Sequence, residues 1–287
     1  MSFYALILVL VASVTHAYWN YLSKQANGKT PFIWLIYSIS VILYLPFVIW
    51  QLIKGGISVT WLVLGIGLVS AILRLSYFVI LQTGYRKADL SVVYPLARGS
   101  GPLFATVGAI LFIHETPNIY SLSGLLLIIA GVLIITKLKI TASLSTRLKA
   151  GLLYGIATGL FIGCYTVWDK FAVSGYNVQP LLLIYISNVF GAVVLAPGSL
   201  NKIAEVKKEI KLHLWHIIAI AILSPFSYIL VLKAMQVTPV LYVAPARELS
   251  ILIGVFMGGR MMNEEDNRRR MFGSIFILTG IICLAFG

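Results

Sequence analysis

Apolar residues fill most of this chain in long runs, and short clusters of Gly, Pro, Asn and charged residues separate the runs. A run of about 20 apolar residues can cross a lipid bilayer as an α-helix. The pattern therefore predicts ten membrane-spanning helices. They are expected at residues 3–23, 32–53, 59–82, 90–113, 119–138, 150–172, 179–199, 214–233, 240–259 and 271–286.

The polar residues that interrupt these runs recur at a fixed distance of 149 positions. Trp19 returns as Trp168, and Arg98 returns as Arg247. The other repeated positions are Asn20 with Asp169, Ala97 with Ala246, Glu115 with Glu264, Gly124 with Gly273 and Gly131 with Gly280. Each half holds five spans, so the second half starts on the opposite side of the membrane. We predict an all-α integral membrane protein of two inverted five-helix repeats, residues 1–140 and 141–287, around a central cavity.

Composition and charge agree with a membrane protein and exclude a nucleic-acid binder. The chain is 60% hydrophobic and only 11% charged, yet its net charge is +13. Sixteen Lys and Arg residues fall in the odd-numbered connections and at their edges, whereas the even-numbered ones hold only Lys54, Lys170 and Lys233. Positive residues gather on the cytoplasmic side of membrane proteins. The bias predicts that both termini are extracytoplasmic.

Polar residues inside the spans are candidates for function, because a charge in hydrocarbon costs about 2.5–3.5 kcal/mol on insertion scales. His16 and Asn20 share one helical face, and Tyr165 and Asp169 repeat that arrangement. Such faces should point into the bundle, since lipid offers no hydrogen-bonding partner. The expected substrate-binding residues of the cavity are His16, Trp19, Asn20, Arg74, Tyr77, Tyr94, Arg98, Tyr165, Trp168, Asp169, Arg247 and Glu248.

Arg98 and Arg247 occupy equivalent positions, so a two-fold axis should bring them to one cavity. Guanidinium groups bind carboxylate, phosphate and phosphonate through paired donors. Alternatively, each arginine pairs internally, with Glu248 as counter-ion, or donates to helix carbonyls near Pro95 and Pro245. Counting all spans, three arginines face at most two acidic residues, which leaves one surplus positive charge.

The two halves differ where a proton carrier could sit. Glu248 stands where the first half has Gly99, and Asp169 stands where it has Asn20. A buried carboxylate beside an arginine can exchange a proton against substrate binding, although a fixed ion pair is the alternative for Glu248. Asp169 lies near a helix end, where water can reach it.

Structural roles are expected for a second group of repeated residues. Glu115 and Glu264 each precede the fifth helix of a repeat, where a carboxylate can cap free amide groups and complement the helix dipole. Small residues permit close helix approach. Packing roles are predicted for Gly124, Gly131, Gly273 and Gly280.

No motif of an enzyme, a metal site or an ATP-driven pump is present in the sequence, so no catalytic residue, metal or cofactor is predicted. The expected partners are a small-molecule substrate and membrane lipid, with no nucleic acid, and a proton is one candidate for the coupling ion.

The repeated segments carry a family resemblance. They read His-Ala-Tyr-Trp-Asn at 16–20, Tyr-Thr-Val-Trp-Asp at 165–169, Tyr-Pro-Leu-Ala-Arg-Gly at 94–99 and Ala-Pro-Ala-Arg-Glu at 244–248, with a Glu before each fifth helix. Over essentially its whole length the chain resembles EamA-type transporters of the drug/metabolite transporter superfamily. The resemblance implies ten helices around a cavity lined by spans one, three, four, six, eight and nine. It also implies cytoplasmic termini, the reverse of the charge-based prediction, which we retain.

Three functions fit these observations. The first is a secondary active transporter that moves a small polar, anionic metabolite across the cytoplasmic membrane by alternating access. The second is a flippase for a lipid-linked phosphate headgroup, which requires a lateral opening between helices. The third is a non-transporting membrane partner or sensor, which gives no reason for symmetric buried arginines.

Overall fold

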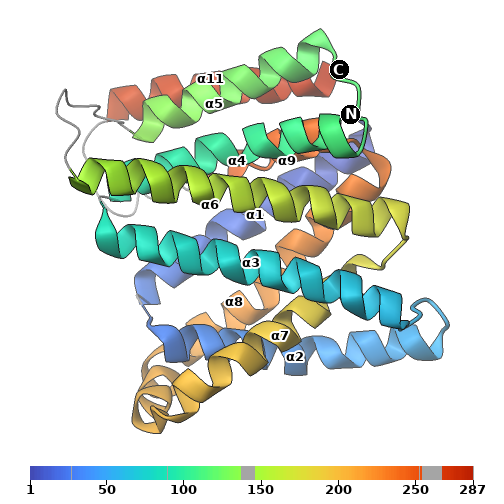
Figure 1. Ribbon diagram of the computed structural model, residues 1–287, viewed down its shortest axis with the longest axis vertical. Helices are drawn as coiled ribbons and strands as arrows, with labels where there is room; N and C mark the ends of the chain where they lie inside the picture. The colour runs from blue at the N-terminus through green and yellow to red at the C-terminus, as the bar shows by residue number, and fades with distance from the viewer. Residues whose placement is uncertain (27, 89, 137–145, 252, 254–266, 287) are drawn as a thin grey trace.

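The computed structural model describes the chain except for residues 27, 89, 137–145, 252, 254–266 and 287. In the described residues the secondary structure is α-helical apart from one π-helical turn, and it contains no strand. The helices are α1 Phe3–Ala26, α2 Thr30–Ile53, α3 Trp61–Lys87, α4 Leu90–Phe112, α5 Ile119–Thr136, α6 Thr146–Lys170, α7 Pro180–Leu200, α8 Ile203–Val237, α9 Val240–Ala246 and α11 Asn267–Phe286, with the π-helical turn at Phe171–Gly175 (Figure 1). The predicted all-α class is confirmed.

The helices are long and apolar enough for a membrane protein. Six of those described, α1, α2, α3, α6, α7 and α8, meet both the length and the hydropathy needed to cross a bilayer. Helices α4, α5 and α11 carry shorter apolar stretches of 10–17 residues. Each predicted span therefore coincides with a described helix, of which α9 is described only for its first two turns.

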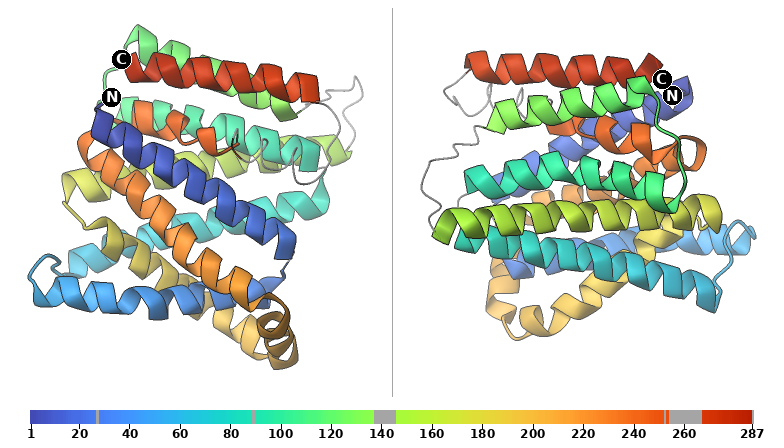
Figure 2. Two further views of the ribbon diagram at one scale, coloured as in Figure 1. Left: turned by 180° about the vertical axis from the view of Figure 1, so that it is seen from behind. Right: turned by 45° about the horizontal axis from the view of Figure 1, so that its top comes forward.

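The two repeats are inverted with respect to each other. Helix α1 and its counterpart α6 begin at opposite ends of the molecule (Figures 1 and 2). The contacts obey the same symmetry, because α1 packs on α8 as α6 packs on α3, and α2 packs on α8 as α7 packs on α3. Helix pairs α2 with α7 and α5 with α11 meet across the two-fold axis. The inverted five-helix architecture is thus confirmed.

Glycines bring α5 and α11 into backbone contact. A Cβ atom added at Gly124 would lie 2.8 Å from the carbonyl oxygen of Gly280, and one added at Gly280 would lie 2.7 Å from that of Gly124. A Cβ atom at Gly131 would lie 2.6 Å from the carbonyl oxygen of Gly273. A residue larger than glycine would not fit at any of these three positions. A two-fold axis exchanges these two contacts, because Gly124 is equivalent to Gly273 and Gly280 is equivalent to Gly131.

Helix α8 begins eleven residues before the predicted span, at Ile203 instead of residue 214. The backbone leaves helical geometry at His213, with φ −129° and ψ 19°, so a short helix precedes the membrane-spanning one. The short segment contains Glu205, which pairs with Lys202 at 3.6 Å, and further Lys residues that favour helix but not hydrocarbon. Apolar length alone therefore missed it.

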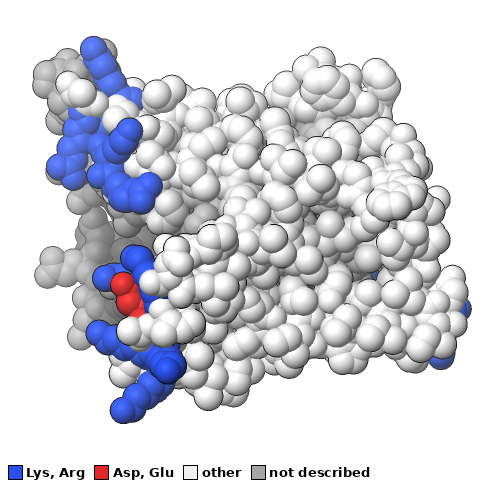
Figure 3. Space-filling model, turned by 60° about the horizontal axis from the view of Figure 1, so that its bottom comes forward, with Lys and Arg blue, Asp and Glu red and all other residues white. Residues whose placement is uncertain are grey.

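Positive charge is gathered at one end of the molecule, here called the basic end (Figure 3). The exposed basic residues at the helix ends there are Lys29, Arg86, Lys87, Arg147, Lys149, Lys202, Lys207, Lys208 and Lys211. Both termini lie at the opposite end (Figure 1). The side of the membrane on which the basic end lies stays a prediction.

Lys170 was wrongly assigned to a connection. It is a buried residue of α6, and its Nζ donates hydrogen bonds to the carbonyl oxygens of Met235, at 2.5 Å, and Thr238, at 3.1 Å. An ammonium group at that position satisfies carbonyl groups that the end of α8 leaves without helical partners. Lys170 therefore connects the end of α6 to the end of α8.

Candidate functional site

The ninth span breaks at its arginine and glutamate. Helix α9 ends before Arg247, and the amide groups of Glu248, Ser250 and Ile251 donate to carbonyls only three residues back, at 3.0, 3.2 and 2.9 Å. Pro245 lacks an amide proton and so removes one α-helical hydrogen bond just before the break. Interrupted helices at mid-membrane are typical of substrate sites in inverted-repeat carriers.

A first group of polar side chains surrounds this break, and we call it the Arg98 cluster: His16, Trp19, Arg98, Arg247 and Glu248. Arg98 Nη1 lies 3.8 Å from Glu248 Oε1, and Arg98 Nη2 lies 3.4 Å from His16 Nε2. The His16 ring meets the Trp19 ring edge-on, with centroids 4.9 Å apart. Helices α1 and α4 of the first repeat thereby meet the broken span of the second.

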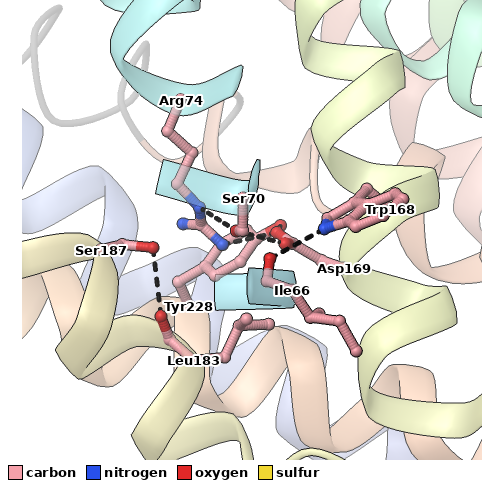
Figure 4. Close-up of polar contacts among 8 residues, drawn as sticks. All are labelled: Ile66, Ser70, Arg74, Trp168, Asp169, Leu183, Ser187 and Tyr228. Carbon is pink, nitrogen blue, oxygen red and sulfur yellow. Dashed lines mark hydrogen bonds and ion pairs between the residues drawn. The ribbon is translucent and has the colours of Figure 1, made fainter. Parts of the chain in front are cut away.

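A second group, the Asp169 cluster, consists of Ser70, Arg74, Asp169 and Tyr228 (Figure 4). The Asp169 carboxylate is fully buried and accepts three hydrogen bonds. The donors are Ser70 Oγ at 2.5 Å, Arg74 Nη2 at 2.5 Å and the Tyr228 hydroxyl at 2.9 Å. Arg74 Nε also donates to Ser70 Oγ, at 3.2 Å. These residues come from α3, α6 and α8.

Tyrosine rings connect the two clusters. The Tyr228 ring lies beneath Arg74, whose Cζ is 4.1 Å from the ring centroid, and within 5.8 Å of Arg247 Cζ. Tyr165 packs edge-on against Tyr228, at 6.2 Å, and against Tyr77, at 5.8 Å. The two guanidinium groups thus share one aromatic wall, whose ring faces are favourable to cations.

Arg247 carries the surplus charge of this region. Arg74 and Arg98 pair with Asp169 and Glu248, the intramembrane carboxylates described by the structure. Arg247 is only 6% exposed, and its Nε has no hydrogen-bond acceptor among the described residues. Trp19 Nε1 is likewise buried without a described partner. The Arg98 cluster therefore holds two donors that have no acceptor among the described residues.

The paired arginines are less buried than their carboxylate partners. The side chains of Arg74 and Arg98 keep 21% and 16% of their surface exposed, whereas those of Asp169 and Glu248 keep 0% and 2%. Each arginine thus keeps part of its side-chain surface accessible, whereas its carboxylate partner is enclosed. The arrangement suits binding of an anion better than binding of a cation.

Several predicted site residues lie differently from expectation. Asp169 is enclosed by three donors, so the prediction that water reaches it is wrong. Asn20 turns back to the carbonyl oxygen of His16, at 2.7 Å, and Trp168 Nε1 donates to that of Ile66, at 3.0 Å. Tyr94 lies in α4, but its side chain is outside the described part of the structure.

Two residues of the Asp169 cluster escaped the sequence analysis. Ser70 lies four positions before Arg74 on the same helical face, a signal that was present in the sequence. Tyr228 has no polar counterpart, since the equivalent position in the first repeat is Val79. Its apolar ring made it indistinguishable from a packing residue.

Glu115 caps a helix of the other repeat. Its Oε1 and Oε2 accept hydrogen bonds from the amide groups of Val240, at 2.8 Å, and Leu241, at 3.1 Å, at the start of α9. The prediction that it caps α5 is wrong, because Asn118 Oδ1 accepts from the Ser121 amide there, at 2.7 Å. Its counterpart Glu264 lies outside the described residues.

Nothing in the described residues forms a metal site, since no group of three or more His, Cys, Asp and Glu side chains comes together. The two clusters offer guanidinium, indole and hydroxyl donors instead. Donors of this kind are able to bind and orient a polar ligand.

Comparison with known proteins agrees with this architecture. The sequence profile of the EamA-like transporter family matches the chain twice, over residues 3–137 and 149–286. A solved crystal structure superimposes on the chain with a TM-score of 0.76, covering 98% of this chain and 96% of that chain at 12% sequence identity. At such low identity the likeness shows the fold alone.

Proposed function

Because the chain belongs to the EamA-like transporter family, we propose that it is a secondary active transporter for a small anionic metabolite, which it carries across the cytoplasmic membrane by alternating access. The observation that supports this proposal most strongly is Arg247. Its guanidinium group is buried, and its Nε has no hydrogen-bond acceptor among the described residues. The intramembrane carboxylates that the structure describes, Asp169 and Glu248, already pair with Arg74 and Arg98.

The chemistry of the donors favours a carboxylate, phosphate or phosphonate. An uncompensated buried charge is costly, and a bound anion offsets that cost. A guanidinium presents paired N–H groups that match two oxygens of such an anion. Trp19 Nε1 offers one further neutral donor. A cation at this position would face net positive charge.

Both ion pairs cross from one repeat to the other. Arg74 and Arg98 belong to the first repeat, whereas their partners Asp169 and Glu248 belong to the second. Rocking of the repeats against each other must lengthen or exchange these contacts. Substrate binding at Arg247 can therefore be linked to the conformational change, and protonation of Glu248 would weaken one of the contacts that hold the repeats together.

A flippase for a lipid-linked phosphate is the second candidate, and the structure gives it less support. The lateral groove between α2, α7 and α8 is lined by none of Arg74, Arg98 and Arg247. A headgroup entering there would not meet the surplus guanidinium. A water-soluble anion therefore accounts better for the two clusters.

Counterflow in proteoliposomes tests the proposal. Vesicles preloaded with unlabelled phosphate, methylphosphonate, succinate or choline would be assayed for uptake of the same labelled compound. We expect uptake of at least one of the three anions and none of choline. Arg86→Gln, at the exposed end of α3, should leave that uptake unchanged, and Arg247→Gln should abolish it. Uptake of choline alone would contradict the proposal.

A further inference from the structure

A groove of about 500 Å³ runs along the membrane-facing side of α2, α7 and α8. Its inner part is apolar and includes Leu43, Ile222 and Phe226. Its outer part is polar and includes Gln51, Gln179 and Lys233. None of these residues belongs to the Arg98 or Asp169 cluster, so the groove is a separate feature.

The groove has the length of one lipid leaflet. Ile222 lies near the middle of the part of α8 that follows His213, and Lys233 lies one turn before the helix ends at Val237. Their eleven-residue separation corresponds to about 16 Å along an α-helix. That is about half of the 30 Å hydrocarbon core of a bilayer. The apolar part therefore faces mid-membrane, and the polar part faces the membrane boundary opposite the basic end.

The outer part of the groove offers a charge and an acceptor. Lys233 is exposed on the lipid-facing side of α8, at the end of the molecule where few cations lie (Figure 3). The neighbouring Lys54 instead stacks on Trp50, with Nζ 4.5 Å from the ring centroid. Gln51 lines this part of the groove through its side chain, and its Oε1, which is enclosed in this conformation, has no hydrogen-bond donor among the described residues. An occupant that supplies an anionic group and a hydroxyl donor would satisfy both.

We propose that this groove binds one anionic phospholipid with a hydroxyl-bearing headgroup, of the phosphatidylglycerol type. An acyl chain lies between α2, α7 and α8, the phosphate pairs with Lys233, and a headgroup hydroxyl donates to Gln51. The amphiphilic gradient of the groove matches a lipid anchored in one leaflet. A soluble anion would leave the apolar inner part without a partner.

The proposal is tested by the lipid that the protein retains. The full chain is reconstituted into nanodiscs of equal parts dioleoyl-phosphatidylglycerol and dioleoyl-phosphatidylcholine and extracted into mild detergent. Native mass spectrometry then counts the bound lipids. We expect one phosphatidylglycerol per protein, retained at least tenfold over phosphatidylcholine.

Matched variants separate the groove from general attraction to anionic lipid. Lys233→Gln should reduce the preference for phosphatidylglycerol to below twofold, whereas Lys211→Gln, at the basic end, should leave it unchanged. Leu43→Trp, which fills the inner part, should remove the bound lipid. Ile42→Trp changes the adjacent residue, which lies outside the groove, and should keep the lipid.

Several results would overturn the proposal. One is an unchanged lipid preference in Lys233→Gln, and another is equal retention of the two lipids by the unaltered protein. Displacement of the lipid by soluble glycerol phosphate would assign the outer residues to a soluble anion instead. Size-exclusion chromatography and circular dichroism of each variant show whether it is folded. If Leu43→Trp does not fold, the lipid preference of Lys233→Gln alone tests the proposal.

Discussion

Among the described residues, Arg74 and Asp169 form a shorter ion pair between the repeats than Arg98 and Glu248, with 2.5 Å between Nη2 and Oδ2. The carboxylate also accepts hydrogen bonds from Ser70 and Tyr228, and no part of it is exposed. A buried carboxylate is stable only while its donors remain, since its desolvation is otherwise uncompensated. Removal of one member alone should therefore destabilise the fold, whether or not substrate is bound.

Arg74→Leu should lower the free energy of unfolding by about 3–5 kcal/mol, the usual cost of leaving one member of a buried ion pair alone. The double variant Arg74→Leu/Asp169→Leu should recover most of that loss, because no unpaired charge remains. Thermal unfolding in detergent measures both, with the exposed Arg86→Leu as control. Equal midpoints for the single and double variants would show that the loss in Arg74→Leu does not come from an unpaired buried charge.

Glu248 is held more loosely than Asp169. Its Oε1 is 3.8 Å from Arg98, and its Oε2 is buried without a described hydrogen-bond partner. If it carries the coupling proton, Glu248→Gln should retain counterflow but lose accumulation driven by a pH gradient. The control is Glu205→Gln, which alters an exposed carboxylate paired with Lys202. Normal pH-driven accumulation by Glu248→Gln would exclude this role.

At the scale of elements, α5 and α11 meet through glycines that leave no space for a Cβ atom. Gly124 lies against the carbonyl oxygen of Gly280, whereas Gly65 in α3 has nothing within 4 Å of its Cβ position. The two positions share a residue type and a helical backbone. They differ only in what surrounds them, so they make a matched pair for substitution.

Gly124→Ala should destabilise the protein, because the added methyl group forces the α5 and α11 backbones apart. Gly65→Ala should be neutral or stabilising by up to about 1 kcal/mol, since alanine is the better helix former. Unfolding midpoints in detergent compare the two. Equal effects of both substitutions would mean that the glycine contact does not hold these helices together.

The positions of the spans could be predicted because apolar length is a local property of the sequence. Contacts between side chains of different helices could not be predicted in this way. Spacing placed Arg74 on a polar face, but nothing local indicated that its carboxylate would come from α6 or that Tyr228 would join it. Glu115 likewise lies between α4 and α5 in the sequence, yet its carboxylate caps α9. Such contacts depend on how the two repeats pack.

At the scale of the whole molecule, the inverted repeat places the basic residues at one end and both termini at the other. The repeats are then joined at mid-membrane by the Arg98 and Asp169 clusters. Positive residues mark the cytoplasmic side of membrane proteins. The fold itself is compatible with either orientation, so the charge distribution is the argument for extracytoplasmic termini.

Labelling with an impermeant thiol reagent tests this orientation. After Cys164 and Cys283 are replaced, Ser2→Cys and Ser58→Cys should react in intact cells, because both positions are exposed at the end opposite the basic residues. Asn201→Cys, exposed beside Lys202, should react only after permeabilisation. The reverse pattern would place the termini in the cytoplasm.

In the proposed mechanism, the surplus guanidinium of Arg247 binds the transported anion. The most direct measurement is the affinity of the purified protein in nanodiscs for the anion that counterflow identifies. Loss of one charge-assisted contact of about 1.5–3 kcal/mol predicts that Arg247→Gln weakens binding by about 10- to 150-fold. Arg247→Lys should restore it only in part, since an ammonium lacks the planar fork, and Arg86→Gln should bind normally. An unchanged affinity in a folded Arg247→Gln variant would show that Arg247 does not bind the transported anion.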